Sequence, residues 1–270
     1  MFNKFLKFLT FLFLLVIPIL SLNLVSTSID LAQSAYCPVR LDNNTNNILE
    51  YDINKNSMRA IVGFNKEYDS TFVSYRGSEN IENWINNIKI KFTYPYSSFP
   101  NAGVELGFYK SYQAIYQDVI NAITSTAKKY GSNSLLLTGH SLGGISTLLA
   151  VDIKKYYPEY VIKSLVTFGS PRIGNPNFVK MLRELNITSS RVTHHYDMVP
   201  HVPEERLGYQ HIPSELWYNE KNSEFKECND MGPESKEDDK CSNSCAPIHC
   251  TSINDHMNYL NVSMGINGDC

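Results

Sequence analysis

The chain of 270 residues lacks a basic surplus, internal repeats and low-complexity tracts. Its formal net charge is −3, so it has no positive field of the kind that holds nucleic acid, and we expect no polyanion partner. The absence of a repeat period argues against a solenoid. Charged residues make up only 19% of the chain and hydrophobic residues 43%, which is globular and not disordered composition. The length fits one α/β domain with a sizeable core.

The N-terminal segment is typical of an exported protein. Two lysines precede an apolar run over residues 8–20, and the small residues Ser26 and Ser28 follow. This pattern predicts a signal peptide over residues 1–28, with an approximate cleavage site, and a secreted or lumenal mature chain without a stable membrane span. The alternative is an uncleaved membrane anchor, because the apolar run approaches spanning length.

The cysteine content also indicates an exported protein. The six cysteines are Cys37, Cys228, Cys241, Cys245, Cys250 and Cys270. An even number behind a signal peptide predicts disulfides, with the pairing open. Three of them lie near His249 at a spacing compatible with zinc, but paired C-x2-C knuckles are missing, so we expect no metal. Sequons at Asn43, Asn186 and Asn261 predict possible N-glycosylation.

Strand-like segments alternate with helical patterns over most of the chain. The strand-like segments span residues 59–64, 71–77, 134–140, 162–170, 191–197 and 215–219. Apolar spacing predicts a helix from about Phe108 that ends at Gly131, followed by helices over roughly 141–157 and 177–185. This alternation predicts a single α/β domain over residues 29–270, with a mixed or largely parallel sheet covered by helices.

One segment departs from this pattern. Residues 220–250 are charged, contain four of the cysteines and show no periodicity. We therefore expect a long loop stapled by disulfides, and long loops of this kind are often functional.

The stretch Gly139 to Gly143 reads GHSLG, a G-x-S-x-G motif between a predicted strand and a predicted helix. Such a turn forces the serine into a tight conformation, and the glycines leave room for the chain. Ser141 would then present its hydroxyl beside a helix N-terminus, where free N–H groups stabilise negative charge. The alternative is a serine that only caps the helix. We expect Ser141 both to begin the helix and to act as a nucleophile.

A serine nucleophile needs a base and an orienting acid, which follow it in the order acid, then histidine, in this architecture. His256 has the required order and lies in a loop near the C-terminus. Asp197 ends a predicted strand before a rigid MVPHVP turn, where open α/β sheets place their sites. The alternatives are an Asx turn for Asp197, and Asp255 as the acid, which its position next to His256 disfavours.

An oxyanion hole needs two N–H donors near the nucleophile. Leu142 follows the nucleophile directly, and an early turn at residues 76–78 is placed to supply the second donor. Beyond that turn four apolar residues recur at helical spacing: Ile81, Trp84, Ile85 and Ile88. Their position predicts a lid that opens at an interface, and the alternative is a plain amphipathic surface helix.

Taken together, the motifs resemble those of the fungal-type class 3 lipases, which are secreted α/β-hydrolases acting on carboxylic esters. The resemblance covers roughly Tyr51 to the C-terminus. Its motifs, in one order, include SYRGSENIENWINNI, LLLTGHSLGGISTLLA, VTFGSPRIGNPNF, HHYDMVPHVP and SINDHMNYL. It implies an α/β-hydrolase fold, with a central mixed and mostly parallel sheet flanked by helices.

The resemblance also implies roles for particular residues. Ser141 would be the nucleophile, Asp197 the acid and His256 the base, with Ser78 and Leu142 forming the oxyanion hole. The helix beginning near residue 79 would be the lid. A disulfide would join residues 37 and 270, while the pairing of the other four cysteines stays open.

The expected function is a secreted triacylglycerol lipase that works through an acyl-enzyme at a lipid–water interface, without metal or cofactor. Phospholipase A1 and feruloyl esterase activities occur on the same scaffold and are the alternatives. A non-catalytic lipid- or glycan-binding protein is disfavoured because all three triad residue types are present. The sequence leaves acyl-chain preference, regioselectivity and oligomeric state open.

Overall fold

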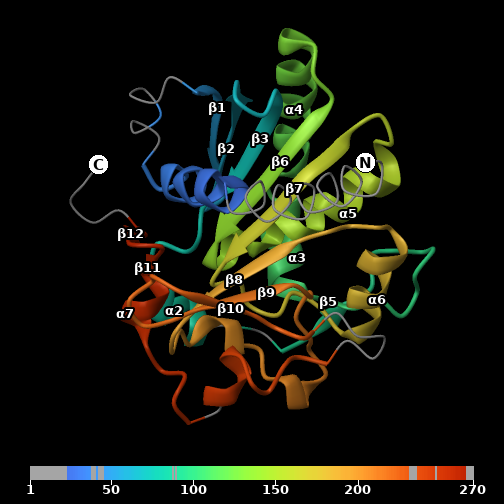
Figure 1. Cartoon of the computed structure of the whole chain (residues 1–270). Helices are drawn as coiled ribbons and strands as arrows, with labels where there is room; N and C mark the ends of the chain where they lie inside the picture. Colours follow the sequence, from blue (N-terminus) through green and yellow to red (C-terminus); the bar gives the residue numbers. More distant parts are fainter. Residues whose placement is uncertain are drawn as a thin grey trace, which may run out of the picture.

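The computed structural model describes residues 23–37, 41, 46–86, 88, 90–230, 236–246 and 248–265. Its centre is an eight-stranded sheet in the order β1-β2-β3-β6-β7-β8-β9-β10 (Figure 1). Strands β3, β6, β7, β8 and β9 run parallel, whereas β1, β2 and β10 pair antiparallel with their neighbours. The sheet is therefore mixed and mostly parallel, as predicted.

The elements have the following bounds. The strands of the large sheet are β1 (Asn47–Lys55), β2 (Met58–Asn65), β3 (Ser70–Tyr75), β6 (Ser134–His140), β7 (Val161–Phe168), β8 (Ser190–His194), β9 (Glu215–Tyr218) and β10 (Phe225–Glu227). Two small ribbons pair β4 (Phe92–Thr93) with β5 (Val104–Glu105) and β11 (Asn258–Tyr259) with β12 (Val262–Ser263). The helices are α2 (Ile81–Asn86), α3 (Leu106–Gln113), α4 (Tyr116–Tyr130), α5 (Ser146–Tyr156), α6 (Pro176–Glu184) and α7 (Ile253–His256).

The sheet is covered on both faces because strand residues alternate between them. Val73 and Leu137 belong to the cluster that packs beneath α4 and α5. Their neighbours Phe72 and Leu136 point the other way, into a cluster with the helix over residues 23–34. Figure 1 shows this N-terminal helix, in blue, lying across the sheet. Two separate apolar layers therefore hold the sheet between them.

The N-terminal helix contains the predicted end of the signal peptide. Residues 1–22 lie outside the described residues, and the predicted boundary at residue 28 falls inside the helix over 23–34. Val25, which precedes that boundary, is 1% exposed and packs in the cluster that contains Phe168. The signal peptide and its cleavage site remain predictions. None of the helices in the described part of the chain has both the length and the apolar character needed to cross a bilayer.

The predicted strands all form, but two helix predictions need correction. The helix predicted to end at Gly131 is two helices, α3 and α4, because Ile115 adopts φ −129° between them. Gly131 does end α4, in the left-handed conformation with φ 70°. The helix predicted from Ser141 starts as a 3-10 segment, η2 (Ser141–Ile145), and becomes α-helical only at Ser146.

The cysteine-bearing segment after β10 is stapled, as expected. Its disulfides are Cys228–Cys241 and Cys245–Cys250, which answers the pairing question that the sequence left open. Cys37 is also disulfide-bonded, and its expected partner at position 270 lies outside the described residues. Within the described residues, the cysteine sulfurs that come near other metal-ligating groups belong to these two bridges and are not free thiolates.

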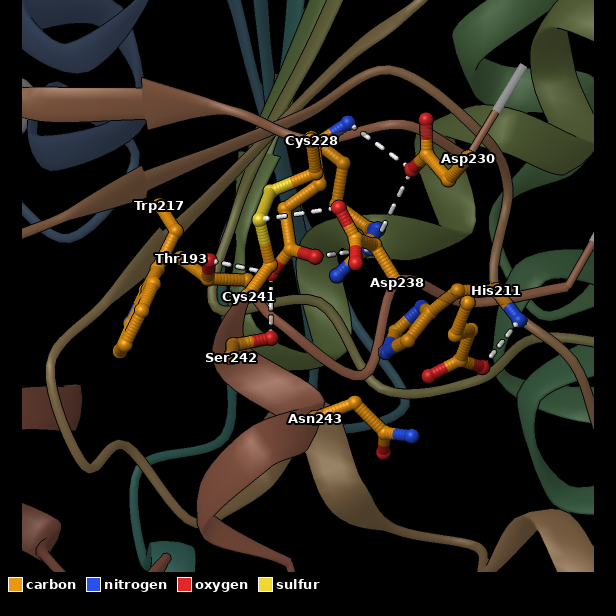
Figure 2. Close-up of polar contacts among 12 residues, drawn as sticks. Thr193, His211, Trp217, Cys228, Asp230, Asp238, Cys241, Ser242 and Asn243 are labelled. Atoms are coloured by element: carbon orange, nitrogen blue, oxygen red, sulfur yellow. Dashed lines mark hydrogen bonds and ion pairs between the residues drawn. A yellow bond between two sulfur atoms is a disulfide. The ribbon is translucent and has the colours of Figure 1, made fainter.

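Buried polar contacts fasten the same segment to the sheet (Figure 2). Asp230 accepts hydrogen bonds from the backbone N–H of Glu215, on β9, and of the preceding residue. Glu215 in turn accepts hydrogen bonds from the hydroxyls of Thr193 and Ser242. Since buried acidic groups are stable only when paired, these contacts fix where the segment lies.

A buried ion pair forms a second anchor. Glu237 forms an ion pair with Arg172 at 2.7 Å, and both side chains are almost fully buried. Burial alone would raise the pKa of Glu237, but the neighbouring His211 and the guanidinium of Arg172 together hold it well below the usual range. This segment is therefore a packed part of the domain, although its sequence has no periodicity.

Candidate active site

The G-x-S-x-G turn has the strained conformation that the sequence predicts. Strand β6 ends at His140, and the next residue, Ser141, has φ 58°, a left-handed value that residues other than glycine rarely adopt. Ser141 begins the 3-10 segment, as expected. However, its hydroxyl makes no hydrogen bond within the described part of the chain, so the serine caps nothing and the capping interpretation is wrong.

Close backbone contacts explain the two glycines of the motif. A Cβ on Gly139 would lie 2.2 Å from the carbonyl oxygen of Gly143. A Cβ on Gly143 would lie 2.2 Å from the carbonyl oxygen of Tyr75, at the end of β3. Either side chain would push the turn apart, so only glycine permits the serine to be held in this position.

Asp197 and His256 come together, although 59 residues separate them. His256 Nδ1 lies 3.0 Å from Asp197 Oδ1 and 2.9 Å from Oδ2. A carboxylate only accepts, so Nδ1 carries the proton and Nε2 keeps a lone pair. That Nε2 has no hydrogen-bond partner among the described residues. The two partners are 2% and 0% exposed, so the pair is shielded from water.

Asp197 is held by two further hydrogen bonds. Its Oδ1 accepts from the backbone N–H of Val199 at 2.8 Å, and its Oδ2 accepts from the hydroxyl of Tyr259 at 2.5 Å. The first contact is the Asx turn that competed with a catalytic interpretation. The turn and the His256 pair coexist, because a carboxylate has enough lone pairs for both.

His140 connects the serine turn to the histidine, a role that the sequence did not reveal. Its Nε2 donates to the carbonyl oxygen of His256 at 2.7 Å, so its Nδ1 accepts from the hydroxyl of Tyr36 at 2.8 Å. Burial lowers the pKa of His140 well below its usual value, which keeps the ring neutral with one donor and one acceptor. Tyr36 and Tyr259 were missed because both contacts join residues far apart in the sequence.

The early turn predicted to form half of an oxyanion hole lies beside the serine. A Cβ on Gly77 would lie 2.8 Å from the Cβ of Ser141. The next residue, Ser78, is half-buried, and its hydroxyl donates to the carbonyl oxygen of Asn80. Leu142 is 6% exposed within η2. The turn that carries Ser78 thus lies beside Ser141, and the oxyanion hole of Ser78 and Leu142 stays a prediction.

The predicted lid helix exists but is shorter than its pattern. Helix α2 ends at Asn86, so Ile88 lies beyond it, while Ile81, Trp84 and Ile85 are half-buried on one side. Asn80 caps its start by accepting a hydrogen bond from the N–H of the third residue of the helix. No residue of α2 is fully buried, so the helix lies on the surface of the domain.

Helix α2 packs against α3 on one side, and an ion pair lies just before its start. The ring of Trp84 stacks on Phe108 of α3, with centroids 5.8 Å apart. Trp84 and Ile88 line a cavity of about 250 Å³ together with residues of α3. Just before the helix, buried Arg76 forms an ion pair with exposed Glu79 at 2.6 Å.

A strained serine between a central parallel strand and a helix, with a histidine–aspartate pair later in the chain, defines a protein of the α/β-hydrolase class. Residues 72–207 match the family described as Lipase (class 3). The match covers half of the chain, and the chain therefore belongs to the class 3 lipase family.

Named relatives and solved structures agree with this assignment. The lipase of Rhizomucor miehei is 31% identical over 226 residues, which are 81% of this chain and 58% of the relative. The secreted mono- and diacylglycerol lipase 1 of Fusarium solani is 30% identical over 164 residues, or 60% of this chain and 48% of the relative. A triacylglycerol lipase structure, described as having a serine protease triad as its catalytic centre, matches with TM-score 0.80 at 26% identity, covering 91% of this chain and 96% of its own. The chain spans about half the length of the curated relatives it matches.

Proposed function

We propose that the chain is a secreted triacylglycerol lipase that hydrolyses lipid esters through Ser141, His256 and Asp197. The observation that carries this proposal is the buried His256–Asp197 pair at 2.9 Å. This pair leaves the Nε2 of His256 with a lone pair that is able to accept a proton. Ser141, with an unpartnered hydroxyl on a strained turn, supplies that proton. Membership of the class 3 lipase family and the names of the relatives support the same chemistry.

In the first step, Ser141 Oγ attacks the carbonyl carbon of the ester while His256 Nε2 takes the hydroxyl proton. Asp197 stabilises the resulting imidazolium and holds its ring in place. Charge develops on the former carbonyl oxygen, and the backbone N–H groups of Ser78 and Leu142 donate to it. The intermediate then collapses, His256 gives its proton to the departing alcohol, and an acyl group remains on Ser141.

In the second step, water replaces the alcohol. His256 Nε2 removes a proton from the water as the oxygen attacks the acyl carbon, and the proton then returns to Ser141 Oγ as the fatty acid leaves. The same side chains therefore serve both steps.

A substrate can reach Ser141 only if a covering segment moves, and a segment with an apolar side moves most readily at a lipid surface. Ser141 is 1% exposed and His256 is 0% exposed, so an ester cannot reach them in this conformation. Helix α2, which follows the turn beside Ser141, is the candidate lid. Its half-buried apolar side would be stabilised by a lipid phase once exposed.

Secretion is supported by several independent features. The described part of the chain contains two complete disulfides, which persist in oxidising compartments. Relatives such as the enzyme of Fusarium solani are named as secreted. The predicted glycosylation sites Asn186 and Asn261 are both exposed, while Asn43 lies outside the described residues.

The proposal is tested by hydrolysis of esters of graded chain length, below and above their solubility limits, with Ser141→Ala as the control. We expect the rate to rise sharply when long-chain triacylglycerol forms an emulsion, and the control to be inactive. Phospholipid and feruloyl esters are assayed in parallel. Hydrolysis of phospholipid alone would make the protein a phospholipase, and hydrolysis of feruloyl esters alone would make it a feruloyl esterase. If no ester of any class is hydrolysed, the proposal is overturned.

A further inference from the structure

The turn after β8, which carries Asp197, and helix α7, which carries His256, are joined by a second histidine–aspartate pair. His195 Nδ1 lies 2.9 Å from Asp255 Oδ2, the same separation as His256 Nδ1 and Asp197 Oδ2. Each of these two segments thus contributes one histidine and one aspartate, and each histidine pairs with the aspartate of the other segment. The inner pair is buried, whereas the side chains of the outer pair are 24% and 19% exposed.

Asp255 binds the three consecutive residues that precede Asp197, the first of which ends β8. Its Oδ2 accepts from His195 Nδ1 and also from the backbone N–H of Tyr196 at 3.0 Å. Its carbonyl oxygen accepts from the Nδ1 of His194 at 3.0 Å. Since Asp255 directly precedes His256, these bonds fix the distance between the acid and the base.

His195 is itself held in a conformation that few residues tolerate. Its φ is 38°, in the left-handed region. Its N–H donates to Tyr218 on β9 and its carbonyl oxygen accepts from the Nε1 of Trp217 on the same strand. Its ring stacks on Tyr196 with centroids 3.8 Å apart. The outer pair therefore ties helix α7, which carries His256, to the sheet.

We propose that His195 and Asp255 are positioning residues for ester hydrolysis, which rests on the function proposed above. They hold His256 Nε2 at the place where it takes the proton of Ser141, without contacting the substrate. Partly exposed ion pairs contribute little to stability. Small displacements of a catalytic base, in contrast, cost much in rate. The effect of the pair is therefore expected in turnover and not in folding.

The experiment compares His195→Ala and Asp255→Ala with the wild type and with His195→Asn. Asparagine keeps a donor near the position of Nδ1 and tolerates the left-handed backbone. We expect kcat to fall about tenfold in both alanine variants, with KM within about twofold, and the melting temperature to change by only about 3 °C. The His195→Asn variant should keep a kcat within about twofold of the wild type.

Asp118→Asn is the matched control, because it neutralises a carboxylate in an exposed ion pair with Lys55 on β1, at 3.0 Å. It should leave kcat unchanged. An unchanged kcat in His195→Ala and Asp255→Ala would overturn the positioning role. So would a loss of kcat in His195→Asn equal to that in His195→Ala.

A second measurement needs no turnover and separates this inference from the proposed function. The proton between His256 Nδ1 and Asp197 should give a downfield proton NMR signal in the wild type and in His195→Asn. We expect it to be broadened or lost in His195→Ala and Asp255→Ala. A signal that is equally sharp in all four proteins contradicts the inference, whether or not any ester is hydrolysed.

Discussion

The hydroxyl of Tyr259 donates to Asp197 Oδ2, the same oxygen that lies 2.9 Å from His256 Nδ1. The acid of the candidate triad is therefore oriented from both sides, by the base and by a tyrosine only three residues beyond that base. Tyr259 is fully buried and packs against the ring of Phe168 on β7.

Tyr259→Phe should reduce both stability and turnover. The change removes a hydrogen bond to a buried carboxylate, which is worth about 1.5–3 kcal/mol. We expect the free energy of unfolding to fall by about that amount, and kcat to fall about tenfold as Asp197 gains freedom. Urea denaturation and steady-state kinetics measure the two effects.

Tyr96→Phe is the control for this change. Tyr96 is equally buried, but its hydroxyl has no hydrogen-bond partner among the described residues. Removing that hydroxyl should be neutral or slightly stabilising, with kcat unchanged. If stability and kcat fall equally in both variants, the hydrogen bond to Asp197 contributes no more than any buried hydroxyl.

Asp152 should make the protein less stable as the pH rises. Burial raises the pKa of this carboxyl from 3.8 to about 6, and among the described residues its side chain accepts a hydrogen bond from the hydroxyl of Tyr112. The folded state therefore prefers the neutral acid, and a cost of ionisation appears as the pH rises from about 4 through 6. Relative to Asp152→Asn, the wild type should lose about 2 kcal/mol between pH 4 and pH 8. Denaturant titrations of both proteins at the two pH values check this, and a pH-independent difference would refute it.

Breaking the ion pair at the start of the candidate lid should ease its opening. Arg76 is buried and Glu79 is 60% exposed, so the pair contributes little to stability. We expect Glu79→Gln to raise the rate on a dissolved short-chain ester about twofold to threefold, with little change on an emulsion. Glu82→Gln removes the same charge from α2, where no ion pair is seen in the described residues, and should change neither rate. If the two variants behave alike, the pair does not hold the lid.

The two disulfides of the segment after β10 should contribute unequally to stability. Cys228–Cys241 spans 13 residues and Cys245–Cys250 spans 5. Loop-closure entropy then predicts losses of about 3 and about 2 kcal/mol when each pair is replaced by serines. Guanidinium denaturation of the two double variants gives the comparison. A larger loss for the shorter bridge would mean that native contacts and not chain entropy set its contribution.

The sequence could predict those parts of the site that depend on local geometry. The serine turn follows from two glycines, a preceding strand and a following helix, and the structure confirms its strain at Ser141. Asp197 and His256 could be selected because chain order leaves few alternatives, and the structure pairs them. The strand segments could also be found, since buried parallel strands are continuous apolar runs.

Contacts between distant segments could not be predicted. Tyr36 and His140 meet across 104 residues, and nothing in the local pattern of either marks the contact. The crossed pair of His195 and Asp255 was hidden for the same reason. Strand β1 was missed because it lies at the sheet edge with partly exposed residues, so burial leaves a weak pattern in its sequence.

The central claim is that Ser141 is the nucleophile, and covalent labelling tests it most directly. The protein is treated with a long-chain phosphonate ester, which transfers its phosphonyl group to an activated serine and releases its leaving group. Peptide mass spectrometry then locates the adduct. We expect a single adduct, on Ser141, together with complete loss of ester hydrolysis, and no labelling of Ser141→Ala. An adduct on another serine, or ester hydrolysis that persists in Ser141→Ala, would contradict it.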